Sequence, residues 1–156
     1  MIRSFLNRLR RDNRGVAIIE LALYAPILAT MTIGVVDISN AFGRKLALEQ
    51  AAQRAIEKVM QTTGDNTVEA ELTAEASAQA GVPNDANHVT VTYRLECDGT
   101  YDSNYDDSCA VGQKEARYIL VTVSDVYHPM FPMHFGDYDS SVSGYRVVAR
   151  AGMRTQ

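Results

Sequence analysis

Residues 16–36 read VAIIELALYAPILATMTIGVV, an apolar run of 21 residues in which Glu20 is the only charged side chain. At 1.5 Å of rise per residue, a helix of this length covers about 31 Å, the thickness of the hydrocarbon core of a bilayer. The run therefore predicts a transmembrane helix over residues 16–36. A carboxylate at the bilayer centre costs at least about 2.5 kcal/mol, so Glu20 is a candidate functional residue.

The residues before this run are basic. Residues 1–15 hold five arginines and one aspartate, a net charge of +4, whereas the whole chain carries −4 and residues 16–156 therefore carry −8. Lys and Arg beside a span stay in the cytoplasm, so we expect a cytoplasmic leader over residues 1–15 and a periplasmic or extracellular C-terminal part. The arginines are interpreted as a topology signal and not as a nucleic-acid patch.

Two simpler interpretations of the N-terminus stay open. A secretory signal peptide also begins with basic residues, but its apolar region spans only about 7–15 residues and ends at a small-x-small site. The run here is longer, contains Pro26 and continues into an amphipathic pattern. The second alternative is an uncleaved signal anchor.

The helical pattern continues beyond the span over residues 37–60. Its apolar positions recur at intervals near three, four or seven, with Arg44 and Lys45 among the charged residues of the other face. The expected apolar positions are Ile38, Phe42, Leu46, Ala52, Ile56 and Val59. One helix is thus predicted from residue 16 to about residue 60, and Pro26, which has no N–H, should kink or loosen it.

The remaining residues, 61–156, predict a small α+β head. A helix over residues 68–80, capped by Thr67, should end at Gly81 and Pro83. Period-two alternation predicts strands from Val89 to Leu95 and over residues 118–127 and 145–154. Short connections favour an antiparallel sheet of three or slightly more strands packed against the outer half of the long helix.

Cleavage between Gly15 and Val16 would give Glu20 a partner. The new α-amino group, with a pKa of about 8, would lie one helical turn from this carboxylate, and neighbouring copies could pair the two groups. This is the logic of type IV pilins. Residues 14–55, RGVAIIELALYAPILATMTIGVVDISNAFGRKLALEQAAQRA, resemble the N-terminus of TadE-like minor pilins (pseudopilins) of the Tad/Flp (type IVb) pilus family, whose recurrent core is E-[FY]-A-L-x-A-P. Leu21 stands where that core carries Phe or Tyr.

The resemblance implies a pilin-like fold and a role in pilus assembly, without a cofactor. A prepilin peptidase would cut after Gly15, and Glu20 would guide the mature subunit, beginning at Val16, into a filament used in adherence and surface attachment. The implied partners are this peptidase, other pilin subunits and the assembly platform of the bacterial inner membrane. The alternative of a different class is an unprocessed, membrane-anchored periplasmic binding or structural module.

Cys97 and Cys109 flank the loop CDGTYDSNYDDSC between the first two expected strands. In an oxidising compartment they are expected to form a disulfide, which in the chain-entropy model stabilises a small domain by about 3 kcal/mol. Two free thiols or a metal pair remain the alternatives.

Two further segments carry metal-ligand residue types. Asn104 and four aspartates of the loop could offer oxygens to calcium, although the spacing is not that of an EF-hand and a solvated acidic loop is the simpler interpretation; the aspartates are Asp98, Asp102, Asp106 and Asp107. The segment from His128 to His134 brings together two imidazoles and two thioethers, a donor set that suits copper, but its prolines favour an ordinary connection.

Enzymatic activity is not expected. The sequence contains no Gly-rich phosphate loop, no H-E-x-x-H, no C-x-x-C and no nucleophile-elbow pattern.

Overall fold

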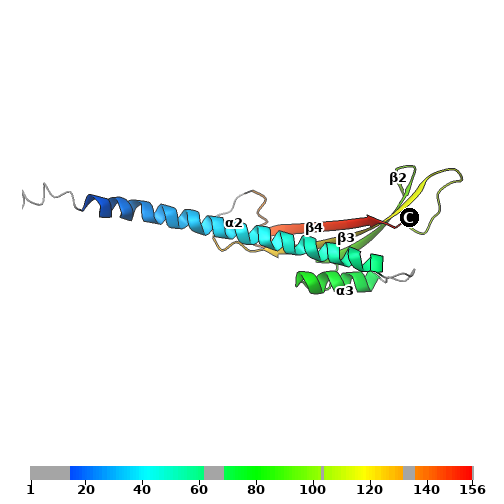
Figure 1. Ribbon diagram of the computed structural model, residues 1–156, viewed down its shortest axis with the longest axis horizontal. Coiled ribbons are helices and arrows are strands. Elements are labelled where there is room, and N and C mark those ends of the chain that lie inside the picture. The colour runs from blue at the N-terminus through cyan, green and yellow to red at the C-terminus, as the bar shows by residue number, and fades with distance from the viewer. Residues whose placement is uncertain (1–14, 62–68, 103, 132–135, 156) are drawn as a thin grey trace, which may run out of the picture. The chain divides into compact units, whose positions relative to one another are not determined.

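The computed structural model describes residues 15–61, 69–102, 104–131 and 136–155. Their helices and strands are, in chain order, α2 (Val16–Gln61), α3 (Glu69–Ala80), β1 (Val89–Cys97), β2 (Thr100–Asp102), β3 (Glu115–Tyr127) and β4 (Tyr145–Arg154) (Figure 1). The chain divides between Ser39 and Asn40 into two compact units, called here the N-terminal unit and the C-terminal unit. The predicted α+β architecture, with a long N-terminal helix and a small antiparallel sheet, is confirmed.

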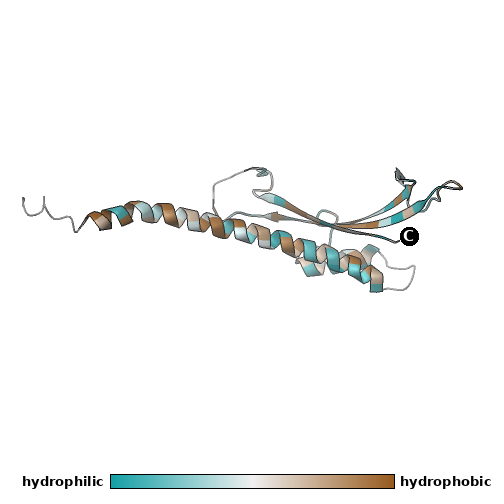
Figure 2. Cartoon of the chain, turned by 45° about the horizontal axis from the view of Figure 1, so that its top comes forward, coloured by the Kyte–Doolittle hydropathy of each residue, from teal (hydrophilic) through white to brown (hydrophobic). Residues whose placement is uncertain are grey.

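The N-terminal unit exposes apolar side chains along α2. Ile18, Ile19 and Leu21 are 66–71% exposed, and large apolar residues remain exposed as far as Ile38. Figure 2 shows hydrophobic residues, in brown, recurring along this part of α2. Among the described residues, α2 is the one helix long and apolar enough to cross a membrane, judged by length and composition. Because the described residues leave this apolar surface uncovered, it is suited to contact lipid or another protein.

The helix α2 continues through Pro26. Because proline has no N–H, the carbonyl of Ala22 loses its helical donor there. One turn further on, the Thr30 hydroxyl donates a hydrogen bond of 2.7 Å to the Pro26 carbonyl. Whether Pro26 loosens the helix in a membrane stays a prediction.

The sheet of the C-terminal unit has the strand order β2-β1-β3-β4, and each neighbouring pair is antiparallel. The strands β1 and β4 begin where the alternation predicts. The strand β3 begins at Glu115, three residues before the expected position, because Glu115 pairs with Cys97 and the ladder therefore runs to the last residue of β1. The short strand β2 was not predicted.

One face of the sheet forms the core together with α3 and the second half of α2. In β3 the side chains of Val121 and Val123 are fully buried, while the intervening residues are only partly covered. The core comprises Leu48, Ala51, Ala52, Ala55, Ile56, Leu72, Ala76, Ala80, Val89, Ile119, Val121, Val123 and Ala149.

The apolar face expected for the second half of α2 is partly wrong. Ala52 and Ile56 are buried as expected, but Phe42 is 64% and Leu46 56% exposed, whereas Leu48 is fully buried. The buried face consists mainly of alanines, whose small side chains let a helix approach its neighbours closely. A hydrophobicity pattern weights large side chains and therefore placed this face incorrectly.

Arg44 was expected on the solvent face and instead joins three elements. Its guanidinium lies 2.6 Å from the Asp125 carboxylate of β3, and its Nη1 donates a 2.7 Å hydrogen bond to the carbonyl of Ala80 at the end of α3. Both charged side chains are about one-quarter exposed. A cation at a helix C-terminus satisfies a carbonyl that has no partner within the helix.

The predicted end of α3 is confirmed. Gly81 has a φ of +63°, and the N–H of Val82 donates to the carbonyl of Ser77 at 3.1 Å, which is the Schellman arrangement. The expected cap, Thr67, lies outside the described residues.

We expect Arg44→Met to destabilise the C-terminal unit by about 1–3 kcal/mol, because it leaves the Asp125 carboxylate and the Ala80 carbonyl without their partner. Urea unfolding of the full chain in detergent, followed by tyrosine fluorescence, measures this loss. The matched control is Lys45→Met, since Lys45 is about half exposed and its ion pair with Glu49 is a surface pair. Equal losses in both variants would contradict the role of Arg44.

Candidate functional site

Two regions hold the residues singled out in the sequence. In the first, α2 begins directly after Gly15, whose carbonyl accepts the N–H of Ile19 at 3.2 Å. A Cβ added at Gly15 would meet no atom within 4 Å, and its φ does not lie in the left-handed region. The described structure therefore gives no steric reason for a glycine at this position.

Glu20 lies in the second turn of α2 and is exposed among apolar neighbours. Leu21 and Tyr24 beside it are also exposed. Among the described residues, Glu20 has no hydrogen-bond or salt-bridge partner, so any group that neutralises it comes from outside this part of the chain. Gly15, Val16 and Glu20 therefore share one exposed helix start.

The second region is the loop between β1 and β3. It begins with a tight hairpin in which Cys97 pairs with Thr100 across Asp98 and Gly99, both with positive φ (51° and 82°). Two central residues with positive φ are typical of a type I′ turn, for which Asp-Gly is a preferred sequence. This dipeptide is the signal by which β2 could have been predicted.

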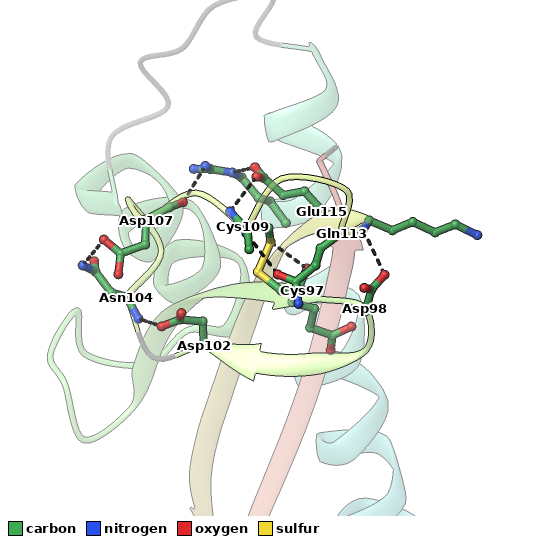
Figure 3. The surroundings of a disulfide bond; sticks show 12 residues. Cys97, Asp98, Asp102, Asn104, Asp107, Cys109, Gln113 and Glu115 are labelled. Atoms are coloured by element: carbon green, nitrogen blue, oxygen red, sulfur yellow. Dashed lines mark hydrogen bonds and ion pairs between the residues drawn. A yellow bond between two sulfur atoms is a disulfide. The ribbon is translucent and has the colours of Figure 1, made fainter.

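A disulfide joins Cys97 to Cys109, with their Cα atoms 5.5 Å apart (Figure 3). The N–H of Cys109 also donates to the Glu115 carboxylate at 3.3 Å. The end of β1, the loop and the start of β3 are thereby tied together at one point.

Arg117 holds the middle of the loop and was missed in the sequence. Its Nη1 donates to the Tyr105 carbonyl at 2.9 Å and its Nη2 to the Asp107 carbonyl at 3.0 Å. Its guanidinium also lies 5.1 Å from the Tyr105 ring, which in turn packs on Tyr93. No local motif could have revealed Arg117, because these partners lie 10 and 12 residues away in the chain.

Arg117 also lowers the pKa of Glu115, two residues earlier on β3. Its Nε donates a 2.8 Å hydrogen bond to Glu115, and this bond holds the pKa of the Glu115 carboxyl below its ordinary value. The same interaction raises the pKa of Arg117. Glu115 is therefore ionised throughout the neutral range.

The aspartates of the loop do not converge on one point. Asp102 accepts the N–H of Asn104 and Asp107 accepts the side-chain amide of Asn104, whereas Asp98 lies on the other side of the disulfide and accepts the N–H of Lys114 (Figure 3). Over the described residues, no group of three His, Cys, Asp or Glu side chains is placed to hold a metal ion. The calcium interpretation thus gains no support from the geometry.

The proposed copper donors can be followed only in part. His128 lies 3.0 Å from the Ser143 carbonyl through its Nδ1, and Met130 is 70% exposed near Asn40. Met133 and His134 lie outside the described residues. The two described donors therefore contact different partners, His128 the Ser143 carbonyl and Met130 the Asn40 amide.

Comparison with known proteins adds one match. The family model described as TadE-like protein matches residues 15–56, which begin at Gly15, contain Glu20 and include most of α2. No curated protein and no solved structure matches the chain.

We expect reduction of the Cys97–Cys109 disulfide, or the double variant C97S/C109S, to lower the free energy of unfolding by about 3 kcal/mol, because the reduced chain regains loop entropy. Chemical denaturation with and without reductant measures this. Labelling of both cysteines by a thiol reagent in the absence of reductant would contradict the bridge.

We expect the Glu115 carboxyl to titrate below its ordinary value in the folded chain. Because the folded pKa is depressed, the stabilising contact with Arg117 is fully present above the unfolded-state pKa and is lost as the pH falls through the folded pKa. Carboxyl ¹³C NMR follows this titration. Arg117→Gln should return the Glu115 pKa toward its ordinary value, and an unchanged titration in this variant would remove Arg117 as the cause.

Proposed function

We propose that this chain, whose residues 15–56 match the TadE-like family model, is a minor pilin of a Tad/Flp-type pilus, processed by a prepilin peptidase after Gly15. The observation that carries the proposal is that the matched segment begins at Gly15 and contains Glu20. The pilus would serve adherence and surface attachment. The subunit would act as a structural component, without catalysis.

The environment of Gly15 supports the processing step. Neither backbone strain nor crowding in the described structure requires a glycine there. A requirement for this residue would therefore come from another protein that recognises it. A peptidase whose active site admits only a very small side chain on the N-terminal side of the cleaved bond would impose such a requirement. The exposed helix start is accessible to it.

Glu20 supports the assembly step. Cleavage would leave the α-amino group of Val16 on one subunit able to pair with the exposed Glu20 carboxylate of a neighbour. In a low-dielectric surrounding each charge would otherwise remain unpaired, so the pairing favours one register of subunits. The amine and the carboxylate together would act as a positioning contact.

The remaining features support a single-pass topology in the inner membrane. The basic residues 1–15 would lie in the cytoplasm and the C-terminal unit in the periplasm before its transfer to the pilus. The Cys97–Cys109 disulfide suits an oxidising compartment. Other pilin subunits and the assembly platform would be the partners.

The processing proposal is tested by intact mass and N-terminal sequencing of the chain from its native membrane, with and without the prepilin peptidase. We expect a start at Val16 that depends on the peptidase, and a full-length chain in Gly15→Phe. A full-length chain in both backgrounds would instead identify an unprocessed anchored module.

The assembly proposal is tested by Glu20→Leu. We expect cleavage to continue and piliation to fall at least about tenfold, because the Val16 amine loses its partner and one unpaired buried charge costs more than 1.4 kcal/mol. Counting sheared pili measures the effect, with Ile18→Leu, two residues earlier on the same exposed helix start, as the control. Normal piliation in Glu20→Leu would remove the assigned role.

A further inference from the structure

The C-terminal unit has a shallow apolar groove between α2 and β4. Its volume is about 230 Å³. Phe42 is 64% and Val148 38% exposed on its walls, which is unusual for large apolar side chains beside a core. The lining residues are Ala41, Phe42, Lys45, Arg146, Val147 and Val148.

The strand that borders the groove is a basic edge of the sheet. The N–H of Thr155 donates a hydrogen bond to the Arg117 carbonyl of β3. Backbone groups of successive residues in a strand point to opposite sides, so those of the odd-numbered residues of β4 face β3. The backbone groups of the even-numbered residues face the outer edge of the sheet. Lys45 reaches this edge with its Nζ 3.4 Å from the Val148 carbonyl. Lys45 is paired with Glu49 and Arg146 with Asp139, both in surface pairs, and Arg150 follows Val148 by two residues on β4, which contains no acidic residue.

A complementary feature projects from the β1–β3 loop. Val111 is fully exposed at the tip of a turn that is closed by two 3.0 Å hydrogen bonds between Ala110 and Gln113. The adjacent Cys109 is fixed by its disulfide. Val111 is thus an apolar side chain presented on a constrained support. Two exposed acids, Asp106 and Asp107, precede it by five and four residues in the chain, and the Asp107 carboxylate accepts a hydrogen bond from the Asn104 amide.

The groove and the Val111 tip lie at opposite ends of the sheet. The groove residues of β4 pair with the last residues of β3, whereas the loop leads into the first residue of β3. The groove residues pair with residues 124–126, which follow Glu115 by 9 to 11 residues, so the two features are about 30–36 Å apart at 3.3 Å per residue. One chain therefore cannot satisfy its own groove.

We propose that the groove of one copy of this chain receives the Val111 tip of a second copy, with Asp106 and Asp107 facing Lys45 and Arg150. The apolar side chain fills an apolar hollow and the acidic residues meet a basic edge, so both contacts are complementary in kind. Because the two surfaces lie at opposite ends, the contact is head-to-tail and leaves one of each surface free. It extends the proposed assembly function but requires no cleavage after Gly15.

A photo-reactive amino acid at position 111 tests this contact. The full chain is purified in detergent micelles as an equal mixture of ¹⁵N-labelled and unlabelled copies, irradiated, digested and analysed by mass spectrometry. We expect mixed-isotope cross-links from position 111 to peptides that contain residues 41–45 or 146–148. Cross-links elsewhere, cross-links within one copy alone, or none at all would overturn the proposal.

A charge exchange keeps the test independent of any single variant. Arg150→Glu and Asp106→Arg should each lower the cross-linked fraction about threefold, as expected for an exposed pair. An equimolar mixture should recover part of it, because each copy then meets a complementary surface on the other, one native and one exchanged. Thr90→Glu, at an exposed site on β1, is the control for added charge. No recovery in the mixture would overturn the predicted pairing.

The result does not depend on the outcome for Gly15 and Glu20. The cross-linking uses the chain without a peptidase or a pilus, so its failure leaves the processing and assembly proposals in place. Conversely, an uncleaved chain that still gives the expected cross-links would retain the head-to-tail contact and lose the minor-pilin role.

Discussion

Close packing of one alanine-rich face of α2 governs the C-terminal unit. Ala51, Ala52 and Ala55 are fully buried in the core that α2 forms with the sheet and α3, and a larger side chain at these positions would overpack it. The Arg44 contacts with Asp125 and Ala80 fix the same three elements laterally. The alanine contacts set how closely α2 approaches the sheet and α3, and the Arg44 contacts fix the position of α2 along β3 and α3.

The N-terminal unit, in contrast, has no buried core among its described residues. Its half of α2 buries none of its large apolar side chains against the described chain, so its partner is lipid or protein. One helix thus serves two surroundings, and its composition changes accordingly. Leu and Ile dominate where none of the described residues covers the helix, and Ala dominates where the helix is buried in the core.

Much of this arrangement follows from periodicity. The long helix, the three main strands and the Gly81 helix end depend on local chemistry, so the sequence predicts them directly. The wrong assignments concern Phe42, Leu46 and Arg44, because a helix pattern reports which residues are apolar but not which face a partner covers. In the candidate site, Gly15, Glu20 and the cysteines stand out by type and spacing, whereas Arg117 acts through backbone carbonyls that no pattern connects to it.

The disulfide at the end of β1 also has a mechanical consequence. A pulling force applied at Val111 would enter β1 and β3 at the same end, because Val111 lies between Cys109, which is bonded to Cys97 at the end of β1, and Glu115 at the start of β3. The disulfide would pass the load to β1 without first extending the loop. The two strands would therefore be pulled together, and their nine residue pairs would keep their register under tension.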